Sequence, residues 1–108
     1  GVVMAGGSSE AAKEKTGLTL RNLNQEIRRQ YDLEEQQKGV LIAEVDPVSV
    51  AARARLRVGM IILEADRKEV DSVREFNRII SESSKNTILL RVLSGGRTSF
   101  VPLRLEKE

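Results

Sequence analysis

A two-glycine turn near the C-terminal end of the chain constrains the fold more than any other feature. Gly95 and Gly96 separate two runs rich in β-branched and aliphatic residues, 87–93 and 98–105. Paired glycines in a short connection supply the positive φ angles that tight β-hairpins need. The two runs are therefore predicted to pair as neighbouring strands of one sheet. Pro102 cannot donate to a ladder, so its strand is expected at a sheet edge.

Apolar runs bounded by turn residues predict the remaining strands. The run 40–45 lies between Gly39 and an Asp-Pro pair, and the run 60–65 follows Gly59. A turn at Asp66 and Arg67 leads to a short returning strand, 68–70. A further short strand is predicted at 18–22, where alternation places Leu18 and Leu20 on one face.

Three helices are predicted from capping residues and apolar spacing. Asn24 begins a helix that continues to Tyr31, with Leu23, Ile27 and Tyr31 on one face. Ser49 caps a short alanine-rich helix at 50–54. The main helix begins at Asp71 or Ser72 and ends near 83.

The main helix carries two neighbouring stripes instead of one. Phe76, Ile79 and Ser83 share one side, whereas Val73, Asn77 and Ile80 share the next. One interpretation is a single wide apolar face packed on the core. The other is that one stripe enters the core while the second walls a groove.

The stretch from Thr16 to Leu20 is the candidate binding element. Gly17 can adopt backbone angles forbidden to other residues, and successive N–H groups can then converge into a small concavity that binds anions. A free peptide carboxylate would suit such a loop. The simpler interpretation is that Gly17 only begins a strand. Lys13 or Lys15 would add favourable charge beside an anion, although exposed linker lysines are usually just solvated.

Composition indicates one globular domain. The chain has 108 residues, of which 40% are hydrophobic and 31% charged, and its net charge is +2. No apolar run approaches the roughly 20 residues of a membrane span, and the N-terminus lacks the features of a signal peptide. With only 3% aromatic residues, no stacking surface for nucleic acid is expected.

The chain contains no histidine and no cysteine. A serine or cysteine nucleophile paired with histidine therefore cannot be assembled, nor can a zinc site of the usual ligands. We expect no enzymatic activity, no cofactor and no metal. The missing cysteines leave the redox compartment open.

Residues 1–15 have the small and charged composition of a flexible linker or added tail, and 16–108 form the predicted domain. Val2, Val3 and Met4 could alternatively end a preceding strand.

The order of these elements resembles a PDZ domain. The resemblance rests on 39–47, Ser49, 51–54, Leu56, Gly59 and 61–63, with 16–18 upstream and the helix at 72–83 downstream, and covers roughly 16–105. The resemblance implies an α+β, mostly β fold. It would be a partly open five- to six-stranded β-sandwich or barrel, capped by two or three helices, with the permuted strand order of bacterial members. The opening Gly-Leu-Thr-Leu-x-Asn-Leu most resembles the second, C-terminal PDZ domain of Deg/HtrA-type periplasmic serine proteases.

The resemblance implies a binding mode. An extended peptide would add as a strand between 18–22 and the helix at 72–83, with its carboxylate on the N–H groups of Thr16, Gly17 and Leu18. Leu18, Leu20 and Ile80 would wall a pocket for its last side chain. The site residues that the resemblance implies are Thr16, Gly17 and Leu18 for the carboxylate loop, and Thr19, Leu20, Arg21, Val73, Asn77 and Ile80 for the pairing strand and groove.

Three departures from the family pattern lie in the scaffold. Val48 follows Pro47 where glycine is usual, Arg55 stands where the short helix usually ends in glycine, and Met60 replaces an aspartate. Arg55 must either take a left-handed conformation at a cost of roughly 1 kcal/mol or the helix must end differently. Met60 is expected to be exposed.

The predicted function is a non-catalytic peptide-binding module of a periplasmic quality-control protease, with peptide C-termini or unfolded segments as partners and no membrane insertion. The alternative is an assembly module that contacts neighbouring protease or PDZ domains and binds free peptide weakly. A third possibility is a PDZ domain from another membrane-associated or processing protease or from a secretion-system component.

Overall fold

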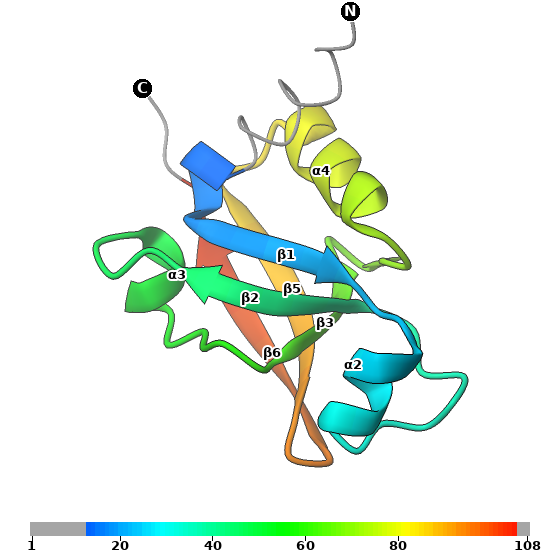
Figure 1. The fold of residues 1–108 in the computed structure, drawn as a ribbon. Coiled ribbons are helices and arrows are strands. Elements are labelled where there is room, and N and C mark those ends of the chain that lie inside the picture. The colour runs from blue at the N-terminus through cyan, green and yellow to red at the C-terminus, as the bar shows by residue number, and fades with distance from the viewer. Residues whose placement is uncertain (1–12, 106–108) are drawn as a thin grey trace, which may run out of the picture.

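A computed structural model describes residues 13–105, which form one six-stranded antiparallel sheet and its covering helices (Figure 1). The strands are β1 (Leu18–Asn22), β2 (Val40–Val45), β3 (Ile61–Ala65), β4 (Lys68–Glu69), β5 (Thr87–Ser94) and β6 (Arg97–Arg104), and the helices are α2 (Gln25–Gln30), α3 (Val50–Arg53) and α4 (Val73–Glu82). Residues 13–16 add a helical turn, so part of the predicted linker is helical.

The sheet is open. Its strands lie in the order β1-β2-β3-β5-β6, and β4 pairs only with β3. This arrangement confirms the predicted partly open, PDZ-like architecture. It leaves β1 at one edge of the sheet and β6 at the other, with Pro102 on the edge strand where the sequence predicts it.

The predicted turns are present. Gly95 and Gly96 have φ angles of 57° and 81° and join β5 to β6. Asp66 and Arg67 join β3 to β4 with φ angles of 55° and 67°. Positive φ at both central residues is the turn geometry whose twist matches a β-hairpin.

One face of the sheet carries the main hydrophobic core. Alternate residues of β2 point into it, including Val40 and Ile42, because side chains of a strand alternate between faces. Phe76 and Ile80 of α4 complete this core and are at most 1% exposed. Met60 is half-buried against the same core, so the expectation that it is exposed is wrong.

The helix α2 covers part of the opposite face. Ile27 packs there with Leu41 and Ile61 in a separate small cluster. Leu23 and Tyr31 border this cluster, which confirms the apolar face predicted for the helix.

The helix ends follow the predicted capping residues. Asn24, Ser49 and Ser72 each accept a hydrogen bond from the backbone N–H three residues later, which satisfies a donor that has no partner inside the helix. Arg55 has a φ of 68°. Of the two conformations considered for this residue, the left-handed one is therefore present.

Candidate functional site

Gly17 is held in a conformation and a space that exclude other residues. Its φ is 82°, in the left-handed region that favours glycine. A Cβ added here would collide with the side chain of Ser49. Because Ser49 also caps α3, the loop before β1 is packed directly on the start of that helix.

The backbone around Gly17 directs one amide to the free edge of the sheet. The N–H of Asp46, just after β2, donates to the carbonyl of Gly17 at 2.9 Å. A trans peptide holds its C=O and N–H on opposite sides, and no described peptide bond is cis. The N–H of Leu18 therefore points away from β2, toward the side on which a strand could be added.

The N–H groups of Gly17 and Leu18, both predicted to bind the carboxylate, already have acceptors inside the chain. The N–H of Gly17 donates to the carbonyl of Lys13 at 2.6 Å. The N–H of Leu18 donates to Oγ1 of Thr16 at 3.1 Å, and the Thr16 side chain is only 1% exposed. A carboxylate at this loop would have to replace or share these acceptors.

The side chains of β1 divide between the core and solvent. Leu18 is buried and Leu20 is half-buried, and both pack on the main core. Thr19 is half-buried and Arg21 is exposed. The pairing with β2 shifts register between Thr19 and Leu20, so a bulge interrupts the ladder in the middle of this short strand.

The second predicted stripe of α4 is less distinct than its spacing indicates. Phe76, Ile79 and Ile80 are all buried in the main core, and Ile80 is fully buried. Val73 packs partly against that core, and Asn77 is half-buried. The two stripes of α4 therefore both contribute to the core, and the predicted groove wall is not separate from it. Ile80 has no surface accessible in this structure.

Asn22 connects the end of β1 to the start of α4. Its Oδ1 accepts a hydrogen bond of 2.8 Å from the N–H of Val73, the first residue of the helix. Sequence reasoning did not identify Asn22. Asn22 is the asparagine of the Gly-Leu-Thr-Leu-x-Asn-Leu opening, but that motif does not indicate its partner, which lies 51 positions away.

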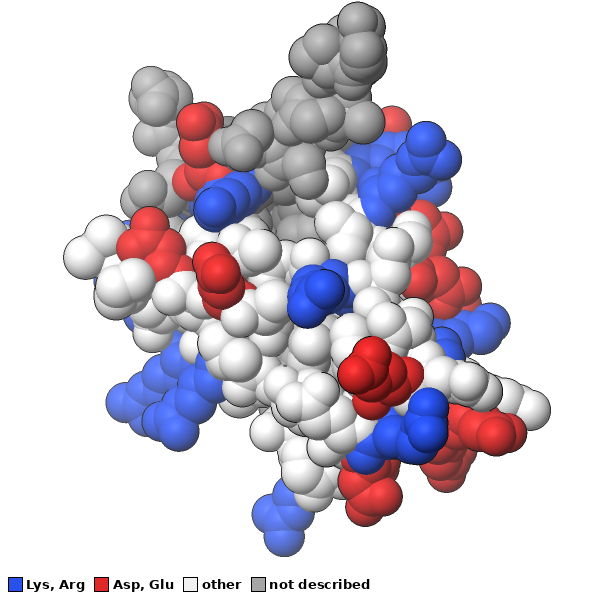
Figure 2. Space-filling view, viewed as in Figure 1, with Lys and Arg blue, Asp and Glu red and all other residues white. Residues whose placement is uncertain are grey.

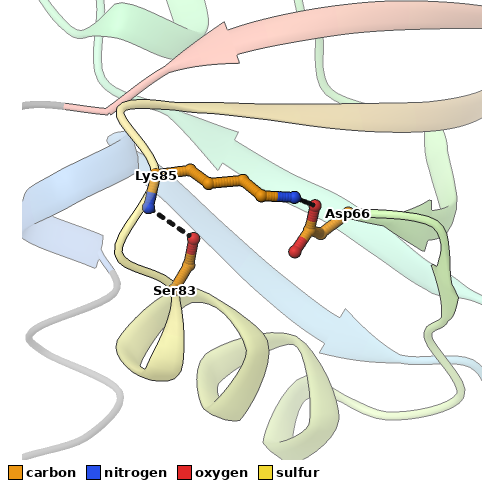
Figure 3. Close-up of polar contacts among 3 residues, drawn as sticks. All are labelled: Asp66, Ser83 and Lys85. Atoms are coloured by element: carbon orange, nitrogen blue, oxygen red, sulfur yellow. Dashed lines mark hydrogen bonds and ion pairs between the residues drawn. The ribbon is translucent and has the colours of Figure 1, made fainter.

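A second tie holds the other end of α4. The ammonium of Lys85 lies 2.7 Å from Oδ1 of Asp66, in the turn between β3 and β4. The backbone N–H of Lys85 also donates to Oγ of Ser83, which follows α4 (Figure 3). Lys85, in the connection after α4, is thus held to the turn between β3 and β4 by its side chain and to Ser83 by its backbone.

On the face that Figure 2 shows, charged side chains of both signs are mixed rather than gathered into one patch. Lys13 is exposed and Lys15 is half-buried in the helical turn that precedes Gly17. The part of the chain that the structure describes holds no cluster of three or more potential metal ligands. Within that part, no helix is long and apolar enough to cross a bilayer.

Comparison with known proteins relates the sequence to DegP-like proteases. No protein-family model matches the chain. A probable periplasmic serine endoprotease, DegP-like, from Chlamydia pneumoniae is 33% identical over 97 residues, which is 90% of this chain and 20% of that protein. A protein of the same description from Pseudomonas putida (strain GB-1) is 33% identical over 102 residues, 94% of this chain and again 20% of the relative.

Solved structures agree in fold. The HtrA3 PDZ domain bound to a phage-derived ligand (FGRWV) has a TM-score of 0.73 at 20% identity, covering 84% of this chain and 83% of that one. The HtrA-type protease AlgW with a decapeptide has a TM-score of 0.75 at 24% identity, over 86% of this chain and 29% of that one. The chain spans about a fifth of the length of the curated relatives it matches. The chain therefore has the fold of the PDZ domains in these solved structures, and its sequence is similar to about a fifth of the length of DegP-like serine endoproteases.

Proposed function

We propose that this domain is the non-catalytic peptide-binding module of a periplasmic serine endoprotease, and that it takes extended or C-terminal apolar peptide segments as an added strand on β1. The names of the relatives support the periplasm and the parent activity. The peptides in the titles of two solved relatives support the ligand class. The placement as a second, C-terminal PDZ domain stays part of this proposal.

The observation that carries the proposal is the free edge of β1 and the amide that it presents. β1 ends the sheet, and Figure 1 shows α4 running alongside it. Main-chain pairing would give affinity and the neighbouring side chains would give selectivity. The N–H of Leu18 faces this edge, and a charge-assisted bond from it to a carboxylate contributes roughly 1.5–3 kcal/mol.

The proposed contacts divide along the strand. Thr16, Gly17 and Leu18 receive the carboxylate, and Thr19, Leu20 and Arg21 run beside the peptide. Val73 and Asn77 face it from α4, whereas Ile80, which is fully buried, would contact the last side chain only if the core opens there on binding. Because Val73 cannot hydrogen-bond through its side chain, selection beside it should be apolar or loose.

The test is a titration of the 108-residue chain with peptides of apolar C-terminus, as free acid and as C-terminal amide, followed by backbone NMR. The acid should bind, the amide should not, and shifts should centre on Gly17, Leu18 and Ile80. Equal binding of acid and amide would contradict carboxylate recognition.

One observation favours the second candidate, an assembly module with little affinity for free peptide. The N–H groups of Gly17 and Leu18 already have internal acceptors, so a free carboxylate gains less from them than from open donors. Absence of any peptide shift, together with binding to a neighbouring PDZ or protease domain of the parent protein, would support this function instead.

A further inference from the structure

We propose that Asn22 closes the far end of the peptide site and limits the paired part of a ligand to the residues beside Leu18–Arg21. This inference rests on the proposed function. Its starting observation is the 2.8 Å hydrogen bond from the N–H of Val73 to Oδ1 of Asn22, which joins the two elements between which the peptide would lie.

Local capping of α4 does not need this bond. Oγ of Ser72 accepts from the N–H of Glu75 at 3.1 Å, and Oε1 of Glu75 accepts from the N–H of Asp71 at 2.7 Å. The first bond caps the helix, and the second satisfies the N–H of the residue just before the N-cap. The hydrogen bond from the N–H of Val73 is exposed, and water could satisfy this N–H if Asn22 were absent. The helix end therefore does not require Asn22, and the role of this bond is to hold α4 to the end of β1.

The tie leaves no room for a strand between its partners. An asparagine side chain reaches roughly 3.5 Å beyond its Cα, and the hydrogen bond adds 2.8 Å. A strand inserted there would need ~4.8 Å from β1 and further clearance from α4. A peptide paired with β1 must therefore leave the sheet edge before Asn22, or the bond must break.

The position of the tie sets the length of the site. β1 has five residues, and Asn22 is the last. An antiparallel ligand with its carboxylate at Gly17 would then place its final residues beside Leu18–Arg21, about four residues in a fully extended chain. The site would bind only the last few residues of a ligand, and the residues before them would not affect affinity.

The test compares ligand length across three forms of the chain. The probes are a four-residue and an eight-residue free-acid peptide that share the same four apolar C-terminal residues. The wild type should bind both within about twofold. Asn22→Ala should favour the longer peptide by about three- to tenfold, the range expected when one hydrogen bond no longer competes with strand pairing. Asn22→Asp keeps an acceptor oxygen at the same position and should behave as the wild type.

The amide resonance of Val73 provides a second readout. It should keep its shift when the wild type binds either peptide, and it should move in free Asn22→Ala. Wild-type preference for the long peptide by tenfold or more, or an equal change for both peptides in Asn22→Ala, would overturn the role of Asn22 while the proposed function stands. If neither peptide binds any of the three folded forms, the proposed function fails and this inference fails with it.

Discussion

The two ends of β1 are built differently. At the loop end, Gly17 has a left-handed backbone and is packed on Ser49, and its carbonyl is bonded to the backbone of Asp46. At the far end, one exposed side-chain bond from Asn22 holds the start of α4. Backbone and close packing fix the first end, so substitutions there should affect folding. A single exposed side-chain bond fixes the second, so its substitution should affect binding more than folding.

The largest expected effect is that of Gly17→Ala. Its positive φ costs roughly 1 kcal/mol for a residue with a Cβ, and the collision with Ser49 adds ~1–3 kcal/mol of overpacking. We expect the free energy of unfolding in urea to fall by about 2–4 kcal/mol.

Gly96→Ala is the matched control for that substitution. Gly96 has a nearly identical φ of 81°, but a Cβ there would meet nothing within 4 Å. It should lose only about 1 kcal/mol. Equal losses for the two variants would show that the contact between Gly17 and Ser49 does not make the loop end rigid.

Ser49→Ala should have the next effect, a loss of about 1 kcal/mol, because α3 loses its N-cap. It should also shift the amide resonances of Gly17 and Leu18, since Ser49 packs on the loop. Ser72→Ala removes the equivalent cap from α4 and should leave those two resonances in place. Movement of both resonances in Ser72→Ala would mean that the two ends of β1 are coupled.

Thr16→Val tests whether the internal acceptor weakens the site. The valine leaves the N–H of Leu18 without the Thr16 hydroxyl, so a carboxylate no longer competes with it. Affinity for a free-acid peptide should rise by about two- to tenfold, measured by calorimetric titration. Thr16→Ser keeps the hydroxyl and should bind as the wild type does, and a gain for the C-terminal amide as well would contradict the explanation.

The smallest effect is expected for Lys85→Ala. Its ion pair with Asp66 is largely on the surface, with the Lys85 side chain 62% exposed, and such pairs contribute ~0–1 kcal/mol. The urea midpoint should change slightly at low salt and hardly at all at high salt. A loss above about 2 kcal/mol would show that this end of α4 is held as tightly as the loop before β1.

The local features of the fold were predictable from the sequence. Apolar runs and turn residues gave the strands, and Asn24, Ser49 and Ser72 marked where helices begin, because caps act within three or four residues. The family resemblance gave the strand order. Each of these signals lies within a short stretch of chain.

The contacts between distant segments were not predictable. Nothing in the sequence pairs Asn22 with Val73 or sets Ser49 against Gly17, since both contacts exist only after the sheet and helices have packed. Spacing placed Ile80 on the outer stripe of its helix, but the depth of the core buries it. The internal acceptors for Gly17 and Leu18 likewise depend on the fold of the loop.

The opposite edge of the sheet has a consequence for how many chains can join. Unpaired strand edges are templates for aggregation, and charge and proline protect them. β6 carries Pro102 between Arg97 and Arg104 on that edge. A domain whose sheet could accept an added strand at both edges would behave as the repeating unit of a growing fibre. If β1 accepts a peptide strand as proposed and β6 does not, strand addition should stop after one added chain, and the domain should not nucleate polymerisation of its ligands.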